Sequence, residues 1–328
     1  MSAALKFILL LDLLFGAIFA HRLYSLHANP APYRDLEIAF LYFADGGALL
    51  HPEVLSGANR AAATLGCSVR LIPTQRNAES LARDLKLAAR AQPGALCVPG
   101  MHGAVTVDTF IREIEAAGIP VATYDEKAQL DPAKHRGNNA GFIGEDPYRN
   151  GWETANELVR RFKLPAGKTV LIAGGRTASG RTRAAGCSDA LRALGLKADI
   201  LSVRRRQSLP LRAQIQHRVE QLGGDVAGVV CVSAVLDAAV EAVEAMGKSA
   251  TIPIAGFGIN PRIEEQVRAG KVAFVSDSQW FVQGFFPVFQ AVLSKRYGLS
   301  GLDCTLPARF LDIETLDRYR PPALKDLS

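Results

Sequence analysis

The sequence predicts an α/β protein made of two doubly wound lobes, each built on a parallel sheet. From residue 36 onward, apolar strand-like runs alternate with amphipathic helix-like runs, which is typical of βαβ units. The same alternation restarts at residue 169 after a polar loop, so a second sheet is expected. The chain has 328 residues, 48% of them hydrophobic, which is enough for two domains that each bury a core.

In the first predicted lobe, glycine, proline or a polar residue follows each apolar run, and each helix has an apolar face. Val54, Ala58, Ala62 and Leu65 recur at helical spacing in the first helix. Gly118 is expected to end the third helix, at residue 117. The predicted strands are 37–43, 69–72, 95–98 and 119–124, and the predicted helices before the third are 52–65 and 78–91.

The second predicted lobe repeats this pattern after a short extended segment at 141–144 and a helix at 147–162. Its predicted strands are 169–173, 198–203, 228–232, 252–257 and 272–276, and its predicted helices are 181–194, 211–222 and a short one from Pro261 to a stop at Gly270. In open α/β sheets, ligands bind outside the carboxyl ends of strands. The strand-end loops of both lobes are therefore expected to border a cleft.

Residues 1–28 have the layout of a secretory signal. Lys6 precedes an apolar run at 7–20 that only Asp12 interrupts, and small residues lie near its end. The run is shorter than the roughly 20 apolar residues that a membrane span requires. We expect export to the periplasm, with an uncleaved N-terminal anchor as the alternative.

Charge and cysteine content predict neither a nucleic-acid partner nor a metal site. The net charge is +6, but apart from 204–206 the basic residues are scattered, and no helix-turn-helix or zinc knuckle is present. The five cysteines lie far apart without a CxxC pair. We interpret them as small buried apolar residues, with at most one disulfide.

The stretch 252–287 resembles the last third of the type I periplasmic binding proteins for simple sugars such as ribose and galactose, which serve ABC transporters. A GF pair with a polar loop, a helix ending in AGK and the run VAFVSDSQWFVQGFFPV are similar to the family pattern GFD, AGK and DQQPYLQGY. The resemblance covers about 36–312. It implies a hinge of three crossings, with 36–145 plus 279–303 in the first lobe and 146–278 plus 304–318 in the second.

The resemblance also implies ligand contacts at strand ends and helix starts. Asp125 follows VATY, similar to the family's VITxD, although a strand-end aspartate also serves to cap a loop. Asp146 aligns with an aspartate of the first crossing, and a cap for the Pro147 helix is the alternative. Arg181 is matched to the arginine of the family's AxxRxxGF, and a cation at a helix start is disfavoured unless a ligand faces it.

Four further candidates follow later strands. Asp277 and Gln279 stand in the DSQW run of the second crossing. Trp280 could cover the apolar face of a sugar ring, with buried packing as the alternative, and Phe257 is similarly placed. Ser233 stands where the family commonly has asparagine or aspartate.

The chain departs from the family pattern at several ligand positions. Leu50 and His51 replace the usual paired aromatics, so a stacking face is expected to be lost there. Gly258 replaces the aspartate of GFD, and Glu126 stands where ribose binders have arginine. His51 and His102 are interpreted as solvated loop residues, with ligand contact as the alternative. No specific sugar is carried over from the resemblance.

We expect an exported, non-catalytic and monomeric solute-binding protein without a cofactor. It is expected to close over a small polar ligand, a sugar or polyol, and to deliver it to an ABC permease. The same fold as a periplasmic sensor for a membrane receptor or histidine kinase is the alternative. A phosphate-substrate enzyme is a weaker alternative, because the loop GGRTASGR lacks the Lys-Ser/Thr ending of a P-loop.

Overall fold

The computed structural model describes residues 36–44, 51–101, 105–125, 139–174, 177–203 and 209–318. The predicted signal or anchor at 1–28 and the positions of Leu50, His102 and Glu126 lie outside these ranges, and so does the side chain of His51. In the part of the chain that is described, no helix has the length and apolar character needed to cross a membrane.

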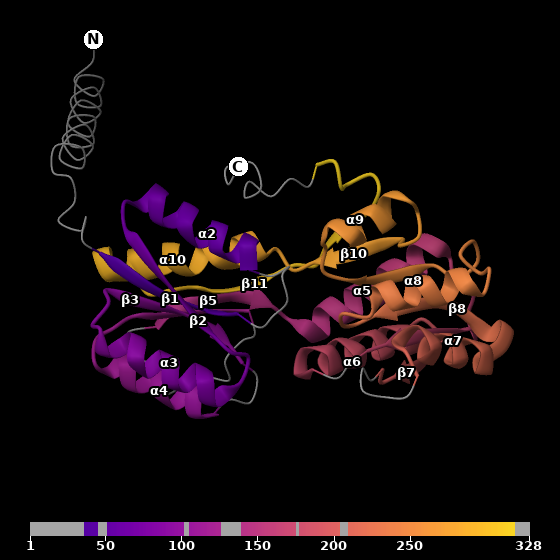
Figure 1. Cartoon of the computed structure of the whole chain (residues 1–328), viewed down its shortest axis with the longest axis horizontal. Coiled ribbons are helices and arrows are strands. Elements are labelled where there is room, and N and C mark those ends of the chain that lie inside the picture. Colours follow the sequence, from indigo (N-terminus) through magenta and orange to yellow (C-terminus); the bar gives the residue numbers. More distant parts are fainter. Residues whose placement is uncertain are drawn as a thin grey trace, which may run out of the picture.

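Each of two lobes contains a sheet (Figure 1). The first sheet consists of β1 (Glu37–Phe43), β2 (Ser68–Thr74), β3 (Ala95–Gly100), β4 (Val121–Asp125), β5 (Asn139–Glu145) and β11 (Asp303–Leu306), in the order β11-β5-β4-β3-β1-β2. The second consists of β6 (Thr169–Ala173), β7 (Lys197–Leu201), β8 (Val226–Cys231), β9 (Ile254–Phe257), β10 (Phe274–Asp277) and β12 (Arg309–Leu311), in the order β12-β10-β9-β8-β6-β7. Strand pairs are parallel except for β12, which runs antiparallel to β10.

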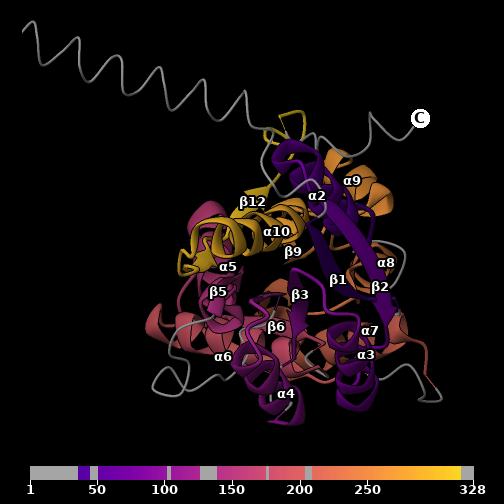
Figure 2. The same ribbon diagram turned by 90° about the vertical axis from the view of Figure 1, so that its left-hand side faces the viewer.

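Helices cover both faces of each sheet. The helices of the first lobe are α2 (His51–Leu65), α3 (Ala78–Arg90), α4 (Val105–Ala116) and α10 (Trp280–Tyr297). Those of the second lobe are α5 (Pro147–Phe162), α6 (Ala178–Ala193), α7 (Leu211–Leu222), α8 (Leu236–Ala245) and α9 (Pro261–Arg268). Seen from the end of the first lobe, α2 and α10 lie on one side of the sheet and α3 and α4 on the other (Figure 2). The two-lobed α/β prediction is confirmed.

The packing of α2 against α10 brings their backbones together. A Cβ atom added at Gly57 would lie 2.1 Å from the carbonyl oxygen of Phe281, and one added at Gly284 would lie 1.9 Å from that of Val54. Only glycine leaves room for this approach. The core of this lobe has two buried layers, one between the sheet and α2 with α10, the other between the sheet and α3 with α4.

The chain crosses between the lobes three times. It leaves the first sheet after Glu145, returns between Asp277 and Trp280, and leaves again between Leu306 and Arg309. The predicted division assigned 304–318 to the second lobe, but β11 pairs with β5 from Asp303↔Phe142 to Leu306↔Glu145. Residues 304–306 therefore belong to the first sheet, because an apolar strand signal does not specify which sheet edge the strand joins.

Other departures concern element ends. Helix α6 begins three residues before the predicted Arg181, because the Thr177 hydroxyl accepts a hydrogen bond from Gly180 N–H and caps the helix earlier. Strand β9 begins after Pro253, which has no N–H to donate to a neighbouring strand. Helix α8 was not predicted from the sequence.

Candidate functional site

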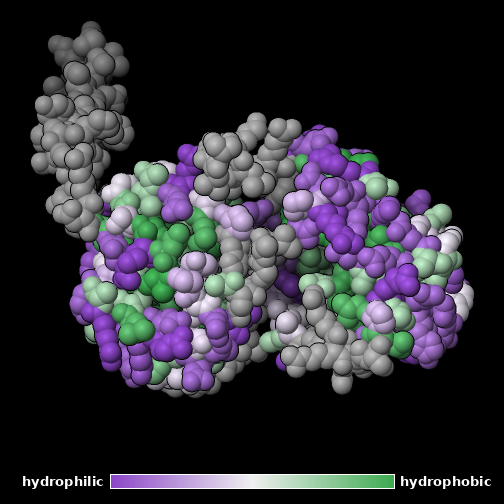
Figure 3. Space-filling view, viewed as in Figure 1, coloured by the Kyte–Doolittle hydropathy of each residue, from purple (hydrophilic) through white to green (hydrophobic). Residues whose placement is uncertain are grey.

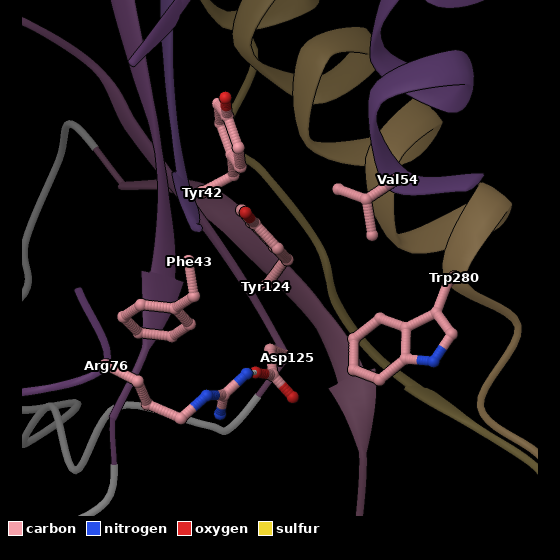
Figure 4. A pocket seen from close by; sticks show the side chains of 7 residues that line it. All are labelled: Tyr42, Phe43, Val54, Arg76, Tyr124, Asp125 and Trp280. Carbon is pink, nitrogen blue, oxygen red and sulfur yellow. Dashed lines mark hydrogen bonds and ion pairs between the residues drawn. The ribbon is translucent and has the colours of Figure 1, made fainter. Parts of the chain in front are cut away.

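A pocket opens at the carboxyl ends of β1 and β4 in the first lobe (Figure 4). Its described lining residues are Tyr42, Phe43, Val54, Arg76, Tyr124, Asp125 and Trp280. Strand β1 has β2 on one side and β3 on the other, so the strand order reverses there. This is the topological switch point at which open α/β sheets bind ligands.

Asp125 ends β4 and faces this pocket, as the sequence predicted for a strand-end aspartate. Its side chain is 14% exposed and its Oδ2 lies 3.1 Å from Nη2 of Arg76. The backbone φ of Asp125 is +71°, in the left-handed region that non-glycine residues seldom adopt. Such conformations cost free energy and concentrate at functional sites, which supports a role for Asp125 beyond loop capping.

Aromatic rings and the side chain of Val54 form the rest of the described pocket wall. Trp280, at the start of α10, lies across the pocket from Phe43 and Arg76 (Figure 4). The Arg76 guanidinium carbon is 4.3 Å from the centroid of the Phe43 ring. The sequence analysis named Trp280 as a candidate to cover a sugar ring, whereas the aromatic residues Tyr42 and Phe43 at the end of β1 were not predicted.

Tyr124 lines the pocket and is fixed in place by contacts with β1. Its hydroxyl donates a hydrogen bond to the carbonyl oxygen of Leu41 at 2.8 Å, and its ring stacks on Phe40 with centroids 5.0 Å apart. Burial raises the pKa of the Tyr124 phenol well above its usual value, and the nearby Asp125 charge adds to the rise. Tyr124 is therefore neutral and has a structural role.

In the second lobe, Arg183, and not the predicted Arg181, lies against the Phe257 ring. The Arg183 guanidinium carbon lies 4.7 Å from the Phe257 ring centroid, and its Nη2 donates to Oε2 of Glu145 at 2.8 Å. Arg181, one half-turn earlier, is exposed. In the pattern AxxRxxGF the arginine precedes the glycine by three positions, which is the spacing of Arg183 to Gly186.

Asp277 and Gln279 lie in the hinge. The Asp277 side chain is 2% exposed; its Oδ1 accepts from the backbone N–H of Gln279 at 3.0 Å, and its Oδ2 is 3.9 Å from Nη1 of Arg309. The Gln279 side-chain amide donates to the carbonyl oxygen of Pro307 at 2.9 Å. These contacts tie the second crossing to the third.

Asp146 caps a helix, and Ser233 lies close to the backbone of Gly174. The Asp146 side chain is exposed and accepts from the backbone N–H of Arg149 at 3.0 Å, so it caps α5. Ser233 follows β8, and a Cβ atom at Gly174, beyond β6, would meet its hydroxyl oxygen at 2.2 Å. Asp146 lies at the first crossing, directly after β5 of the first sheet, and Ser233 lies in a strand-end loop of the second lobe.

Three residues with the contacts described above were not predicted: Arg76 in the pocket, and Glu145 and Arg183, which pair with each other between the lobes. Arg76 lies in the loop after β2, where no strand-end signal marked it. Glu145 is 9% exposed and accepts from both Arg183 and Asn150. The position of Glu145 directly before Asp146 at the crossing could have marked it as a candidate. A sequence does not show, however, which lobe a carboxylate faces.

No group of three or more histidine, cysteine or acidic residues suited to a metal ion occurs in the described ranges. The five cysteines are free thiols. In the loop proposed for phosphate, Thr177 acts as a helix cap, and residues 175–176 are outside the described ranges.

A family model described as a periplasmic binding protein domain matches residues 38–294. None of the curated proteins matches the chain by sequence. Among solved structures, a glucose-galactose binding protein from Geobacillus stearothermophilus is 20% identical, with a TM-score of 0.69 over 86% of this chain and 99% of that one. A sugar-binding protein of a sugar ABC transporter from Bacillus halodurans is 18% identical, with a TM-score of 0.74 over 87% and 100%.

A carbohydrate transporter protein from Acidothermus cellulolyticus, in complex with myo-inositol, is 18% identical, with a TM-score of 0.70 over 87% of this chain and 96% of that one. These likenesses agree with the two-lobed fold. The family match covers well over half of the 328 residues and confirms the predicted resemblance. The chain therefore belongs to the family of periplasmic binding protein domains.

Proposed function

We propose that this protein is an exported solute-binding protein that closes its two lobes over a small polar ligand, a sugar or polyol, and delivers it to an ABC permease. It acts as a monomer, by binding and without catalysis. Family membership supports the binding role, and the solved relatives named for sugars or myo-inositol support the ligand class.

The observation that carries the ligand class is the pocket of the first lobe. It combines aromatic rings with an arginine–aspartate pair at the ends of parallel strands. Sugars are held by such combinations, because aromatic faces cover C–H groups and charged side chains bind hydroxyl groups. In the space-filling view, the surface is hollowed between this lobe and the other (Figure 3).

Closure requires contacts from both lobes. In this proposal Asp125 and Trp280 bind from the first lobe, and Arg183 with Phe257 binds from the second. The ligand then stabilises the closed state, because its full set of contacts exists only there. Four other predicted contacts remain part of the proposal: Asp146, Ser233, Asp277 and Gln279. In it, Arg183 takes the role that the sequence analysis expected of Arg181.

A panel of neutral sugars, polyols, sugar acids, amino sugars and nucleosides tests this function by thermal unfolding and calorimetric titration. A ligand at about 100 times its Kd adds about 2.7 kcal/mol to the free energy of unfolding. We expect a neutral sugar or polyol to raise Tm by several degrees and Asp125→Ala to abolish the shift. Turnover of a phosphorylated compound, or shifts only with nucleosides, would contradict the proposal. A sensor role has the same binding step, and no described residue favours it over delivery.

A further inference from the structure

Glu145 connects the two lobes at the first crossing. Its backbone ends β5, where it pairs with Leu306 in the first sheet. Its side chain is buried and binds the second lobe instead. The carboxylate oxygen Oε2 accepts a hydrogen bond from Nη2 of Arg183 on α6 at 2.8 Å and another from the side-chain amide of Asn150 on α5 at 3.1 Å. Glu145 thus belongs to one lobe by its backbone and to the other by its carboxylate.

Both partners of this carboxylate are fixed within the second lobe. The side-chain oxygen of Asn150 accepts from the hydroxyl of Ser276 on β10 at 2.7 Å, and both residues are buried. A Cβ atom added at Gly151 would lie 2.1 Å from the carbonyl oxygen of Arg183, so α5 and α6 meet backbone to backbone at this point. Asn150 and Arg183 therefore move together when the second lobe moves.

The torsions that set the lobe angle at this crossing lie between the Glu145 side chain and α5. Rotation about ψ of Glu145, or about φ or ψ of Asp146, turns α5 and α6 but leaves the Glu145 Cβ with the first sheet. Such a rotation must break the hydrogen bonds to Arg183 and Asn150 or force the Glu145 side chain out of its rotamer. Separation from Arg183 would leave a buried carboxylate without its counter-charge, which is costly. The ion pair therefore resists a change in the angle between the lobes.

The two lobes are apart in this structure. Every described residue that lines the pocket belongs to the first lobe, whereas Arg183 and Phe257 lie on the second. The space-filling view shows the hollow that separates them (Figure 3). The contacts of Glu145 are therefore contacts of the open arrangement.

We propose that the ion pair between Arg183 and Glu145 is a latch that holds the lobes open in the absence of ligand. On closure the Arg183 guanidinium turns from Glu145 to the ligand, whose contacts offset the loss of the pair. Glu145 keeps its hydrogen bond from Asn150 in both states. The latch rests on the lobe closure of the proposed function, but not on its ligand class.

Pulsed electron paramagnetic resonance tests the latch without any ligand. Nitroxide labels are placed on exposed positions of the two lobes, through Glu113→Cys on α4 and Ala185→Cys on α6. Cys67→Ser and Cys304→Ser remove the two native thiols that are not buried. Helices α4 and α6 lie along the lower edge of the two lobes, so the distance between the labels follows the lobe angle (Figure 1).

The label distances are compared between the protein with Glu145 and its variants Glu145→Gln and Glu145→Ala. We expect a single longer distance with Glu145 and an added shorter distance in both variants. If loss of the pair favours closure about 10-fold, a closed minority of a few per cent rises to about a fifth of the molecules. Melting temperatures verify that each variant is folded.

Glu157→Gln is the matched control. Glu157 is a largely buried carboxylate that pairs with Arg160 and Arg161 on its own helix, so its change weakens ion pairs that do not join the lobes. Its label distances should equal those of the protein with Glu145 and Glu157 intact.

Unchanged distances in folded Glu145→Gln and Glu145→Ala would overturn the latch and leave the proposed function standing. A shorter distance of the same size in Glu157→Gln would also overturn the latch, because any weakened ion pair would then have this effect. A shorter distance in the Glu145 variants alone supports the latch. It would still do so if no sugar or polyol of the panel were bound, a result that overturns the proposed ligand class.

Discussion

The backbone N–H of Asp125 donates a hydrogen bond to the side-chain oxygen of Gln283 at 3.0 Å, across 158 positions of sequence. The nitrogen of the same amide donates to the carbonyl oxygen of Ser278 at 2.6 Å. Gln283 is fully buried. One side chain thus joins the aspartate of the pocket to the second crossing between the lobes.

Gln283→Leu is expected to weaken both folding and ligand binding. It leaves the Asp125 N–H and the Ser278 carbonyl without this partner, which should lower the free energy of unfolding by about 2–4 kcal/mol. Release of Asp125 should also raise the ligand Kd about 10-fold. Denaturant unfolding and calorimetric titration measure the two effects.

The control for this variant is Gln290→Leu, two turns further along α10. Gln290 is also buried, and its side-chain oxygen accepts from the backbone N–H of Leu302, away from the pocket. The Gln290→Leu variant should be less stable than the unmodified protein but bind the ligand with the same Kd. Equal loss of affinity in both variants would show that Gln283 affects binding only through stability.

Asp146→Asn distinguishes a helix cap from a ligand contact. Asparagine caps helices as well as aspartate does, so the hydrogen bond to Arg149 N–H and the stability should be retained. Asp146→Ala should cost about 1 kcal/mol. If Asp146 binds the ligand, Asp146→Asn should raise Kd at least several-fold at unchanged Tm. An unchanged Kd would leave only the capping role.

The two arginines of α6 are expected to differ in their effect on binding. Arg183→Ala should raise the ligand Kd at least 10-fold, because it removes the guanidinium beside Phe257. Arg183→Ala also leaves the Glu145 carboxylate without one of its donors. The double variant Arg183→Ala/Glu145→Gln removes that carboxylate charge and is the control for this effect. Arg181→Ala should change Kd less than 3-fold. The reverse order in a titration would restore Arg181 as the ligand contact.

Gly284→Ala should destabilise the protein by about 3 kcal/mol or more, because its Cβ would meet backbone atoms of α2 that have no rotamer to change. Gly224→Ala is the matched control, since a Cβ there has no atom within 4 Å. Chemical denaturation should show a normal midpoint for Gly224→Ala. A similar midpoint for Gly284→Ala would mean that the helices separate easily.

Asp312 should make part of the stability depend on pH. Burial acts to raise the pKa of this carboxyl, but hydrogen bonds from Thr315 and Arg161 outweigh burial, and the pKa is lowered. A lowered folded-state pKa stabilises the protein above the unfolded value of about 3.9, and this contribution is lost as pH falls through the folded value. Asp312→Asn should therefore cost about 1–2 kcal/mol at pH 7.

The pH dependence itself provides the check. The difference in unfolding free energy between the unmodified protein and Asp312→Asn should shrink below about pH 4. Unfolding by urea at several pH values measures it. A difference that stays constant from pH 7 to pH 3 would show that Asp312 acts through packing.

The strands and helices could largely be predicted from the sequence, because hydrophobic periodicity reports burial on one face. Helix 147–162 and strand 169–173 agree with the prediction at both ends. The position of β11 could not be predicted, because edge pairing depends on distant strands. That Asp125 faces the pocket could be expected from its strand-end position. Arg76 comes from another loop, and sequence spacing does not show that the two side chains pair.

The glycine contact between α2 and α10 has a mechanical consequence. Helix α10 begins at Trp280, where the second crossing enters the first lobe, and at Gly57 and Gly284 it touches α2 backbone against backbone. No side chain at this contact can repack to absorb a movement. The two helices should therefore move as one rigid unit with the first lobe when the angle between the lobes changes, and Val54 and Trp280 should keep their relative positions in the pocket wall.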